Sequence, residues 1–261
     1  MQNFINYKNI KIHFSSTGKG AVVVLLHGFL EDSSMWKNIV PELVKKNRII
    51  TIDLLGHGKT ACLGYVHSME EQAEIVHAVL RSLRLRKYQL IGHSMGGYVA
   101  LAYAKLYPKT MKGLCLMNAT FFADDEERKH LRLRANKMAQ NNFNNIVRLS
   151  FTNLFSESSR TAFKPELKNA LKTALKTPLQ GYIASQEGMR IRENFEMFFK
   201  KATFKKEIVI GKKDSVVNTK KLLSFAEENQ IKTYLLSEGH MSHIENKKEL
   251  IMALKEFVAL N

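Results

Sequence analysis

A serine between glycines is the residue of this chain best suited to do chemistry. Residues 92–97 read GHSMGG and contain the pattern G-x-S-x-G, with Ser94 at its centre. In this pattern the serine lies at a tight strand-to-helix turn that exposes its hydroxyl as a nucleophile. A chain of this length contains the pattern by chance roughly one time in ten. Its position between an apolar run and a helical pattern therefore favours a nucleophile over a glycine-rich surface turn.

A serine nucleophile needs a base and an acid that orients the base. Two histidines three residues apart follow the last apolar run, and we predict His240, directly after a glycine, over His243. This base would take the proton of the serine hydroxyl.

The predicted acid is Asp214, which follows the apolar run at 207–210. Open α/β sheets gather their chemistry at the carboxyl ends of their strands. Asp124 and Asp125 are the alternatives, although their acidic run is typical of a helix N-terminus. The order serine, aspartate, histidine along the chain is the order that this kind of turn requires.

Backbone amides could receive the negative charge that develops on a substrate oxygen. His27, Gly28 and Phe29 follow the apolar run at 21–26. We predict that the N–H groups of Phe29 and Met95 form an oxyanion hole. Gly28 would permit the turn, and we expect the His27 ring to be bonded within its own loop. We also predict that His27 and Gly28 contact the substrate.

The elements that must position these residues alternate between short apolar runs and longer helical patterns, which indicates a parallel sheet covered by helices. The run at 21–26, AVVVLL, is continuously apolar, as a strand buried on both faces should be. The run at 10–14 alternates like an edge strand. We expect strands at 10–14, 21–26, 48–53, 88–92, 113–117, 207–210 and 231–236, and helices at 68–85 and 96–106.

Four segments together resemble the α/β-hydrolase superfamily: HGFL at 27–30, DLLGHGKT at 53–60, GHSMGG at 92–97 and GHMSHIEN at 239–246. In that family the histidine of the terminal G-H pair is the base and a G-x-x-D loop carries the acid, which supports His240 and Asp214. The serine at the strand-to-helix turn argues against the dehalogenase and epoxide-hydrolase branches, which have an aspartate at that position.

The resemblance implies an α/β fold with a mostly parallel, eight-stranded sheet flanked by helices. Residues 121–206 are polar and helical, and strands resume after them. We therefore expect residues 1–120 and 207–261 to form the core, with 121–206 as a helical cap inserted after the sixth strand.

These parts fit acyl transfer to water, so we predict a serine hydrolase that cleaves a small-molecule carboxylic ester through an acyl-enzyme. No cofactor and no metal is expected, because the sequence has neither a histidine/cysteine cluster nor a phosphate-binding loop. The alternative is a lyase or C–C bond hydrolase acting on a carboxylated substrate, for which Arg190 or Arg192 could bind the carboxylate. A signal-binding protein without turnover is a third hypothesis, which an intact triad disfavours.

In the segment between 189 and 199, Met189 and Arg190 are predicted substrate contacts. Its apolar side chains could line an acyl pocket: Met189, Phe195, Met197, Phe198 and Phe199. A stripe at helical spacing is more often the face that packs against the core. Likewise, the two arginines could be a solvated helix end.

Composition excludes several classes of protein. Of the 261 residues, 45% are hydrophobic and 25% charged, which is ordinary globular composition. The net charge of +16 is spread along the chain without a nucleic-acid-binding motif, so no specific nucleic acid is expected. With two cysteines, no signal-peptide pattern and no run near the roughly 20 apolar residues of a membrane span, we predict a cytoplasmic protein without a membrane segment. The sequence does not indicate an oligomeric state.

Overall fold

Eight strands form one twisted sheet in the computed structural model, which describes residues 2–259. The order across the sheet is β1-β2-β4-β3-β5-β6-β7-β8. The β1–β2 and β2–β4 pairs are antiparallel and every later pair is parallel, which confirms the mostly parallel, eight-stranded sheet. The strands are β1 (Gln2–Tyr7), β2 (Ile10–Thr17), β3 (Ala21–Leu26), β4 (Asn47–Ile52), β5 (Tyr88–His93), β6 (Met111–Met117), β7 (Lys205–Gly211) and β8 (Lys232–Leu236).

The edge of the sheet differs from the prediction. The run at 10–14 belongs to β2, and β1 lies outside it as the edge strand. Lys8 and Asn9 join the two strands with φ of 43° and 66°. Positive φ at both turn positions is the geometry of a tight hairpin whose twist matches that of the strands.

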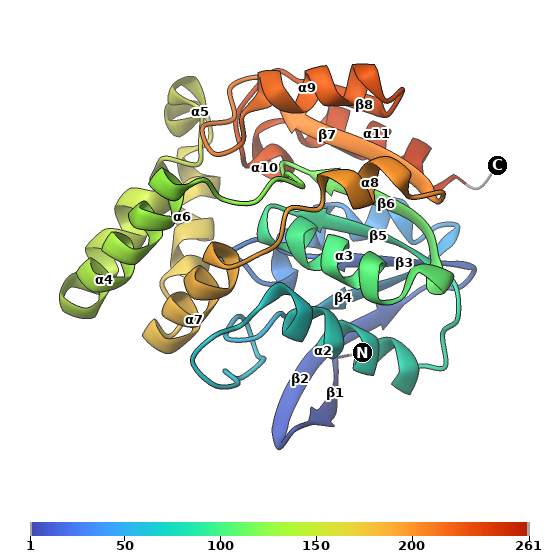
Figure 1. Cartoon of the computed structure of the whole chain (residues 1–261), viewed down its shortest axis with the longest axis horizontal. Coiled ribbons are helices and arrows are strands. Elements are labelled where there is room, and N and C mark those ends of the chain that lie inside the picture. Colours follow the sequence, from blue (N-terminus) through green and yellow to red (C-terminus); the bar gives the residue numbers. More distant parts are fainter. Residues whose placement is uncertain (1, 260–261) are drawn as a thin grey trace.

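Helices cover both faces of the sheet (Figure 1). One face packs against α2 (Met69–Ser82), α3 (Met95–Leu106) and α9 (Thr219–Glu228), and the other packs against η1 (Ser33–Asn38), α1 (Val40–Leu43) and α11 (Lys247–Val258). The central strands are therefore buried on both sides, which explains their continuous apolar sequences. Two short helices, η2 (Pro108–Thr110) and α10 (Ser242–Glu245), lie within connections.

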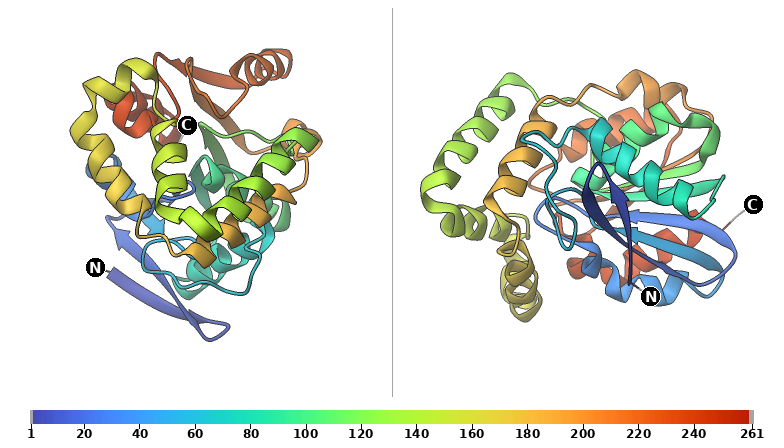
Figure 2. Two further views of the ribbon diagram at one scale, coloured as in Figure 1. Left: turned by 90° about the vertical axis from the view of Figure 1, so that its left-hand side faces the viewer. Right: turned by 90° about the horizontal axis from the view of Figure 1, so that it is seen from below.

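Five helices lie between β6 and β7: α4 (Glu126–Thr152), α5 (Glu157–Ala162), α6 (Lys164–Ala174), α7 (Leu179–Arg190) and α8 (Glu196–Lys201). The insertion thus follows the sixth strand. Helices α4–α7 stand together beyond one end of the sheet (Figures 1 and 2). Helices α4, α6 and α7 share an apolar cluster that includes Phe151 and Tyr182, and this cluster extends to Leu30 and Met241 of the sheet loops.

Helix α8 differs from its four predecessors because it packs against the body of the sheet domain. The Phe199 ring stacks on Phe121 with their centroids 5.1 Å apart, inside the main core cluster. None of the helices within residues 2–259 is both long and apolar enough to cross a membrane.

Candidate active site

Ser94 lies between β5 and α3 in a backbone conformation that few residues adopt. Its φ is 49° and its ψ is −117°, a strained combination that surrounding packing must enforce. The neighbouring glycines provide that packing. A Cβ at Gly92 would lie 2.3 Å from the Gly96 oxygen, and one at Gly96 would lie 2.4 Å from the Leu26 oxygen. Strand and helix can therefore meet this closely only with glycine at both positions.

The structure brings the three predicted catalytic side chains together. His240 Nε2 is 2.9 Å from Ser94 Oγ, and His240 Nδ1 is 2.8 Å from Asp214 Oδ2. The three residues follow β5, β7 and β8 respectively, so three parallel strands end at one place. An imidazole between a hydroxyl and a carboxylate can take the hydroxyl proton while the carboxylate stabilises the resulting charge.

Asp214 is held as a carboxylate by its surroundings. Its Oδ1 accepts the backbone N–H groups of Val216 and Val217 at 2.8 and 3.0 Å, and its Oδ2 also accepts Asn118 Nδ2 at 3.0 Å. Burial alone would raise the pKa of Asp214, but the contact with His240 and these hydrogen bonds hold the pKa below its usual value. The position of Asn118 was not anticipated from the sequence.

The alternative acids and base lie elsewhere. Asp125 caps α4 by accepting the Arg128 N–H at 2.8 Å, and Asp124 pairs with Arg132 at 2.5 Å and Arg192 at 2.8 Å. His243 Nε2 is 3.5 Å from Glu31. None of these side chains reaches the Ser94 hydroxyl.

The two residues whose amides are predicted to form an oxyanion hole both lie near the serine. Met95 is the first residue of α3, and the first amides of a helix have no acceptor within it. Phe29 lines the same cavity as Ser94.

The predicted substrate contacts His27 and Gly28 lie outside that cavity. His27 is fully buried, with Nδ1 2.8 Å from the Gly28 oxygen and Nε2 accepting the Leu54 N–H at 2.9 Å. The contact with Gly28 lies within its own loop, as expected, and the bond from Leu54 joins that loop to the loop after β4. A Cβ at Gly28 would lie 2.5 Å from Glu31 Oε2, so the chain is tightly packed there.

A cavity of about 210 Å³ opens over Ser94 and His240 between the sheet loops and α4 and α7. Of the two other predicted contacts, Met189 lines it, whereas Arg190 does not and pairs with Glu187 at 2.8 Å. Met189, Phe195 and Phe199 all belong to the core cluster, and among the Phe and Met residues at 189–199 only Met189 lines this cavity. The lining comprises Phe29, Leu30, Glu31, His93, Ser94, Tyr98, Arg128, Arg132, Ser150, Phe151, Leu154, Gln186, Met189, Val216, His240 and Met241.

Two arginines of this lining were missed in the sequence. Arg128 and Arg132 are four residues apart on one face of α4, and Asp124 lies four residues before Arg128, just outside the helix N-terminus. Arg132 is 13% exposed in its side chain and also donates to Gln186 at 2.6 Å. Arg192, the other candidate for a substrate carboxylate, is buried against Asp124 and the Tyr98 ring and does not line the cavity.

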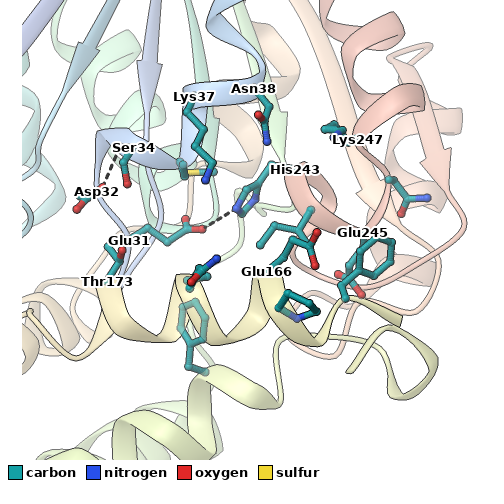
Figure 3. A pocket seen from close by; sticks show the side chains of 18 of the residues that line it. Glu31, Asp32, Ser34, Lys37, Asn38, Glu166, Thr173, His243, Glu245 and Lys247 are labelled. Atoms are coloured by element: carbon teal, nitrogen blue, oxygen red, sulfur yellow. Dashed lines mark hydrogen bonds and ion pairs between the residues drawn. The ribbon is translucent and has the colours of Figure 1, made fainter. Parts of the chain in front are cut away.

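A larger cavity of about 710 Å³ lies on the far side of Leu30 and Glu31, and Ser94 does not line it. Figure 3 shows Glu31, Lys37, Asn38, Glu166, Thr173 and His243 around it, with Glu31 and His243 facing each other. It is bounded by η1, α6 and α10.

Glu31, His93 and His243 bring a carboxylate oxygen and two imidazole nitrogens within 4.8 Å of one another, a grouping that could hold a metal ion. Glu31 Oε2 and His93 Nδ1 are, however, 2.6 Å apart, the length of a strong hydrogen bond. Two ligands of a tetrahedral zinc ion, each about 2.1 Å from the metal, lie about 3.4 Å apart. The Glu31–His93 pair therefore has the geometry of a hydrogen bond and not that of two ligands of one zinc ion.

Comparison with known proteins agrees with this architecture. The family model described as alpha/beta hydrolase fold matches residues 21–246. Over 99% of this chain, the structure superposes with a TM-score of 0.92 on 98% of a thermophilic esterase from Thermogutta terrifontis, at 26% identity.

Two curated relatives match shorter segments. A 2-hydroxy-6-oxo-6-(2'-aminophenyl)hexa-2,4-dienoic acid hydrolase of Metapseudomonas resinovorans is 28% identical over 123 residues, 46% of this chain and 42% of the relative. A putative 2-succinyl-6-hydroxy-2,4-cyclohexadiene-1-carboxylate synthase of Bacillus subtilis (strain 168) is 37% identical over 100 residues, 38% of this chain and 36% of the relative. The chain thus spans less than half of either relative. The family model, by contrast, covers most of this chain, which belongs to the α/β-hydrolase family.

Proposed function

We propose that the protein is a serine hydrolase that cleaves a small-molecule carboxylic ester. The observation that carries this proposal is the continuous contact from Asp214 through His240 to the Ser94 hydroxyl, with distances of 2.8 and 2.9 Å. The Thermogutta terrifontis structure, an esterase, adds support through its likeness over nearly the whole chain.

In the proposed reaction, Ser94 Oγ attacks the acyl carbon while His240 Nε2 takes the hydroxyl proton. Asp214 keeps the His240 ring in the required orientation and balances its positive charge. The amides of Phe29 and Met95 receive the oxyanion. The alcohol leaves with the proton from His240, and a water molecule then repeats these steps to release the acid.

We further propose that residues 121–206 act as a cap that defines the substrate. Helices α4 and α7 supply Phe151 and Met189 to the cavity wall. The cavity of about 210 Å³ is smaller than the roughly 300–1,000 Å³ that holds a drug-sized ligand. A short acyl chain is therefore the best fit.

Hydrolysis of p-nitrophenyl acetate, butyrate and octanoate tests the proposal. The wild type should act on the acetate and butyrate more efficiently than on the octanoate. Ser94→Ala should lose at least 10³-fold in kcat because it removes the nucleophile. Ser224→Ala, which changes an exposed serine of α9, serves as the control and should retain wild-type activity. Equal turnover by Ser94→Ala and the wild type would contradict the proposal.

A second candidate is C–C bond hydrolysis or a lyase reaction on a carboxylated substrate. Arg128 and Arg132 line the cavity, and with Arg192 they surround a single carboxylate, that of Asp124. Three guanidinium groups against one carboxylate give this cluster an excess of two positive charges, and two of its three arginines line the cavity over Ser94. The names of both curated relatives contain a carboxylic acid or carboxylate.

Arg132→Met discriminates between the candidates. Loss of a charged hydrogen bond costs about 1.5–3 kcal/mol, so kcat/KM for a carboxylate-bearing substrate should fall roughly 10- to 150-fold. Turnover of a neutral ester should change little. Arg134→Met, on an exposed part of the same helix, is the matched control. Activity on carboxylated dienones with none on any simple ester would favour the second candidate over ester hydrolysis.

A further inference from the structure

His93, the residue before the nucleophile, has hydrogen-bond acceptors at both ring nitrogens. Its Nδ1 is 2.6 Å from Glu31 Oε2, and its Nε2 is 3.0 Å from the backbone oxygen of His240. A carbonyl can only accept, and the same Glu31 oxygen already accepts the Gly28 N–H at 2.8 Å. Because the pKa of Glu31 is lowered to about 2, its carboxylate also only accepts, and both nitrogens of His93 then donate as an imidazolium.

The charges of this pair stabilise each other in a buried setting. His93 is 1% exposed and Glu31 is 5% exposed. Burial would lower the pKa of His93, but the Glu31 carboxylate raises this pKa above its usual value. Burial would also raise the pKa of Glu31, but the charge and hydrogen bond of His93 lower it to about 2.

The peptide group of His240 is held from two sides. Its oxygen accepts the His93 Nε2 proton, and its N–H donates to the Leu154 oxygen at 3.1 Å. His93 is adjacent to Ser94 along the chain, so one side chain connects the backbone of the nucleophile to the backbone of the base. The loop that carries His240 has no direct pairing with β5, because β6 and β7 lie between β5 and β8.

We propose that His93, which the Glu31 carboxylate holds in place, is a positioning residue that fixes the His240 backbone, and thereby the His240 ring, within reach of Ser94. This inference rests on the proposed triad but not on the substrate. Neither side chain need touch the reacting atoms. Their effect is on the distance between Nε2 of the base and the serine oxygen, where displacements of about 1 Å can reduce rates 10²-fold.

His243 offers a matched control within the same cluster. It is buried, its Nε2 lies 3.5 Å from the other Glu31 oxygen, and its ring faces that of His93 at 5.5 Å. It faces the larger cavity, where Figure 3 shows it opposite Glu31. Replacement of His243 perturbs the buried cluster without removing the bond to the His240 oxygen.

Two amide substitutions at position 93 separate the two hydrogen bonds. In His93→Asn the side-chain nitrogen replaces Nδ1, which keeps the donor to Glu31 and loses the donor to His240. In His93→Gln the nitrogen replaces Nε2, which keeps the donor to His240 and loses the donor to Glu31. The readouts are the rate at which a fluorophosphonate labels Ser94, kcat and KM for p-nitrophenyl acetate, and the melting temperature.

We expect His93→Asn to slow labelling of Ser94 and lower kcat about 10²-fold, with KM within about threefold. His93→Gln should label within about threefold of the wild type although its melting temperature also falls. His243→Asn should label at the wild-type rate. A labelling rate that falls equally in His93→Asn and His93→Gln, or only in proportion to lost stability, would overturn the proposal.

A measurement on the wild type keeps the inference testable if the variants do not fold. The imidazole ¹⁵N spectrum at pH 7 should show protons on both nitrogens of His93, and a neutral His93 would contradict the ion pair. Failure of the ester proposal is distinguishable, because Ser94 would then react with fluorophosphonate while no ester is turned over.

Discussion

At the scale of single residues, the buried charges below the triad make the stability of the fold depend on pH. Glu31 has a pKa lowered to about 2, so its charge stabilises the folded chain above pH about 4.5 and this contribution is lost as the pH falls toward 2. His93 has a raised pKa, so its contribution is complete below pH about 6.5 and is lost as the pH rises through the raised value. The pair should contribute most between these limits.

Glu31→Gln should accordingly lower the free energy of unfolding most near pH 5.5. Breaking one side of a buried ion pair costs about 3 kcal/mol or more, and the difference from the wild type should shrink below pH 4.5 and again at alkaline pH. Denaturant unfolding of both proteins from pH 3 to pH 9 measures this. Glu42→Gln, which removes an exposed contact with Lys255, should show little change throughout. A pH-independent difference for Glu31→Gln would refute the ion pair.

At the scale of elements, the active site depends on how closely β3, β5 and the start of α3 approach one another. A methyl group at Gly96 would collide with the Leu26 oxygen at 2.4 Å and the His27 oxygen at 2.6 Å. Since backbone atoms form both contacts, the helix itself must move. The position of Ser94 would move with it.

Gly96→Ala should therefore lose activity beyond its loss of stability. We expect kcat to fall at least 10²-fold, together with about 1–3 kcal/mol of stability from overpacking. Gly64→Ala is the comparison, because Gly64 has a φ of 70° and no atom within 4 Å of an added Cβ. It should cost stability through backbone strain and leave kcat unchanged. Measurements of kcat and of thermal unfolding for both variants test this prediction.

Local patterns in the sequence were sufficient to predict the elements that carry the three residues of the proposed triad. The GHSMGG turn, the run before Asp214 and the glycine before His240 each lie within a few residues of the side chain they position. Strand β1 was missed because QNFINY has no strong apolar alternation and is an edge strand. The Glu31–His93 contact joins residues 62 positions apart, and no local pattern encodes such a pair. The cavity-lining face of α4 depends on tertiary packing, although the four-residue spacing from Asp124 to Arg132 was visible.

At the scale of the whole molecule, 40 basic against 24 acidic residues give a net charge of +16. Such an excess raises the local concentration of anions around the protein and accelerates their association. The effect has a range set by salt, about 30 Å at 0.01 M and about 8 Å at 0.15 M.

Substrate charge should therefore decide how the enzyme responds to salt. The kcat/KM for a carboxylate-bearing ester should fall about tenfold between 0.01 and 0.15 M salt, whereas that for a neutral ester of similar size should remain nearly constant. Steady-state rates at several sodium chloride concentrations provide the measurement. A parallel decline for both esters would instead indicate a general effect of salt on the protein.

The order of the elements along the chain has a consequence for biosynthesis. Ser94 and the strand-to-helix turn that holds it belong to the first half of the sequence, but Asp214 and His240 follow the five inserted helices. Because a ribosome makes the chain from its N-terminus, a growing chain presents the proposed nucleophile well before the proposed base. In the proposed mechanism, the Ser94 hydroxyl therefore remains an ordinary alcohol during most of translation and becomes reactive only when β7 and β8 join the sheet beside β6. On this proposal, the helices inserted between β6 and β7 delay activation of the nascent chain.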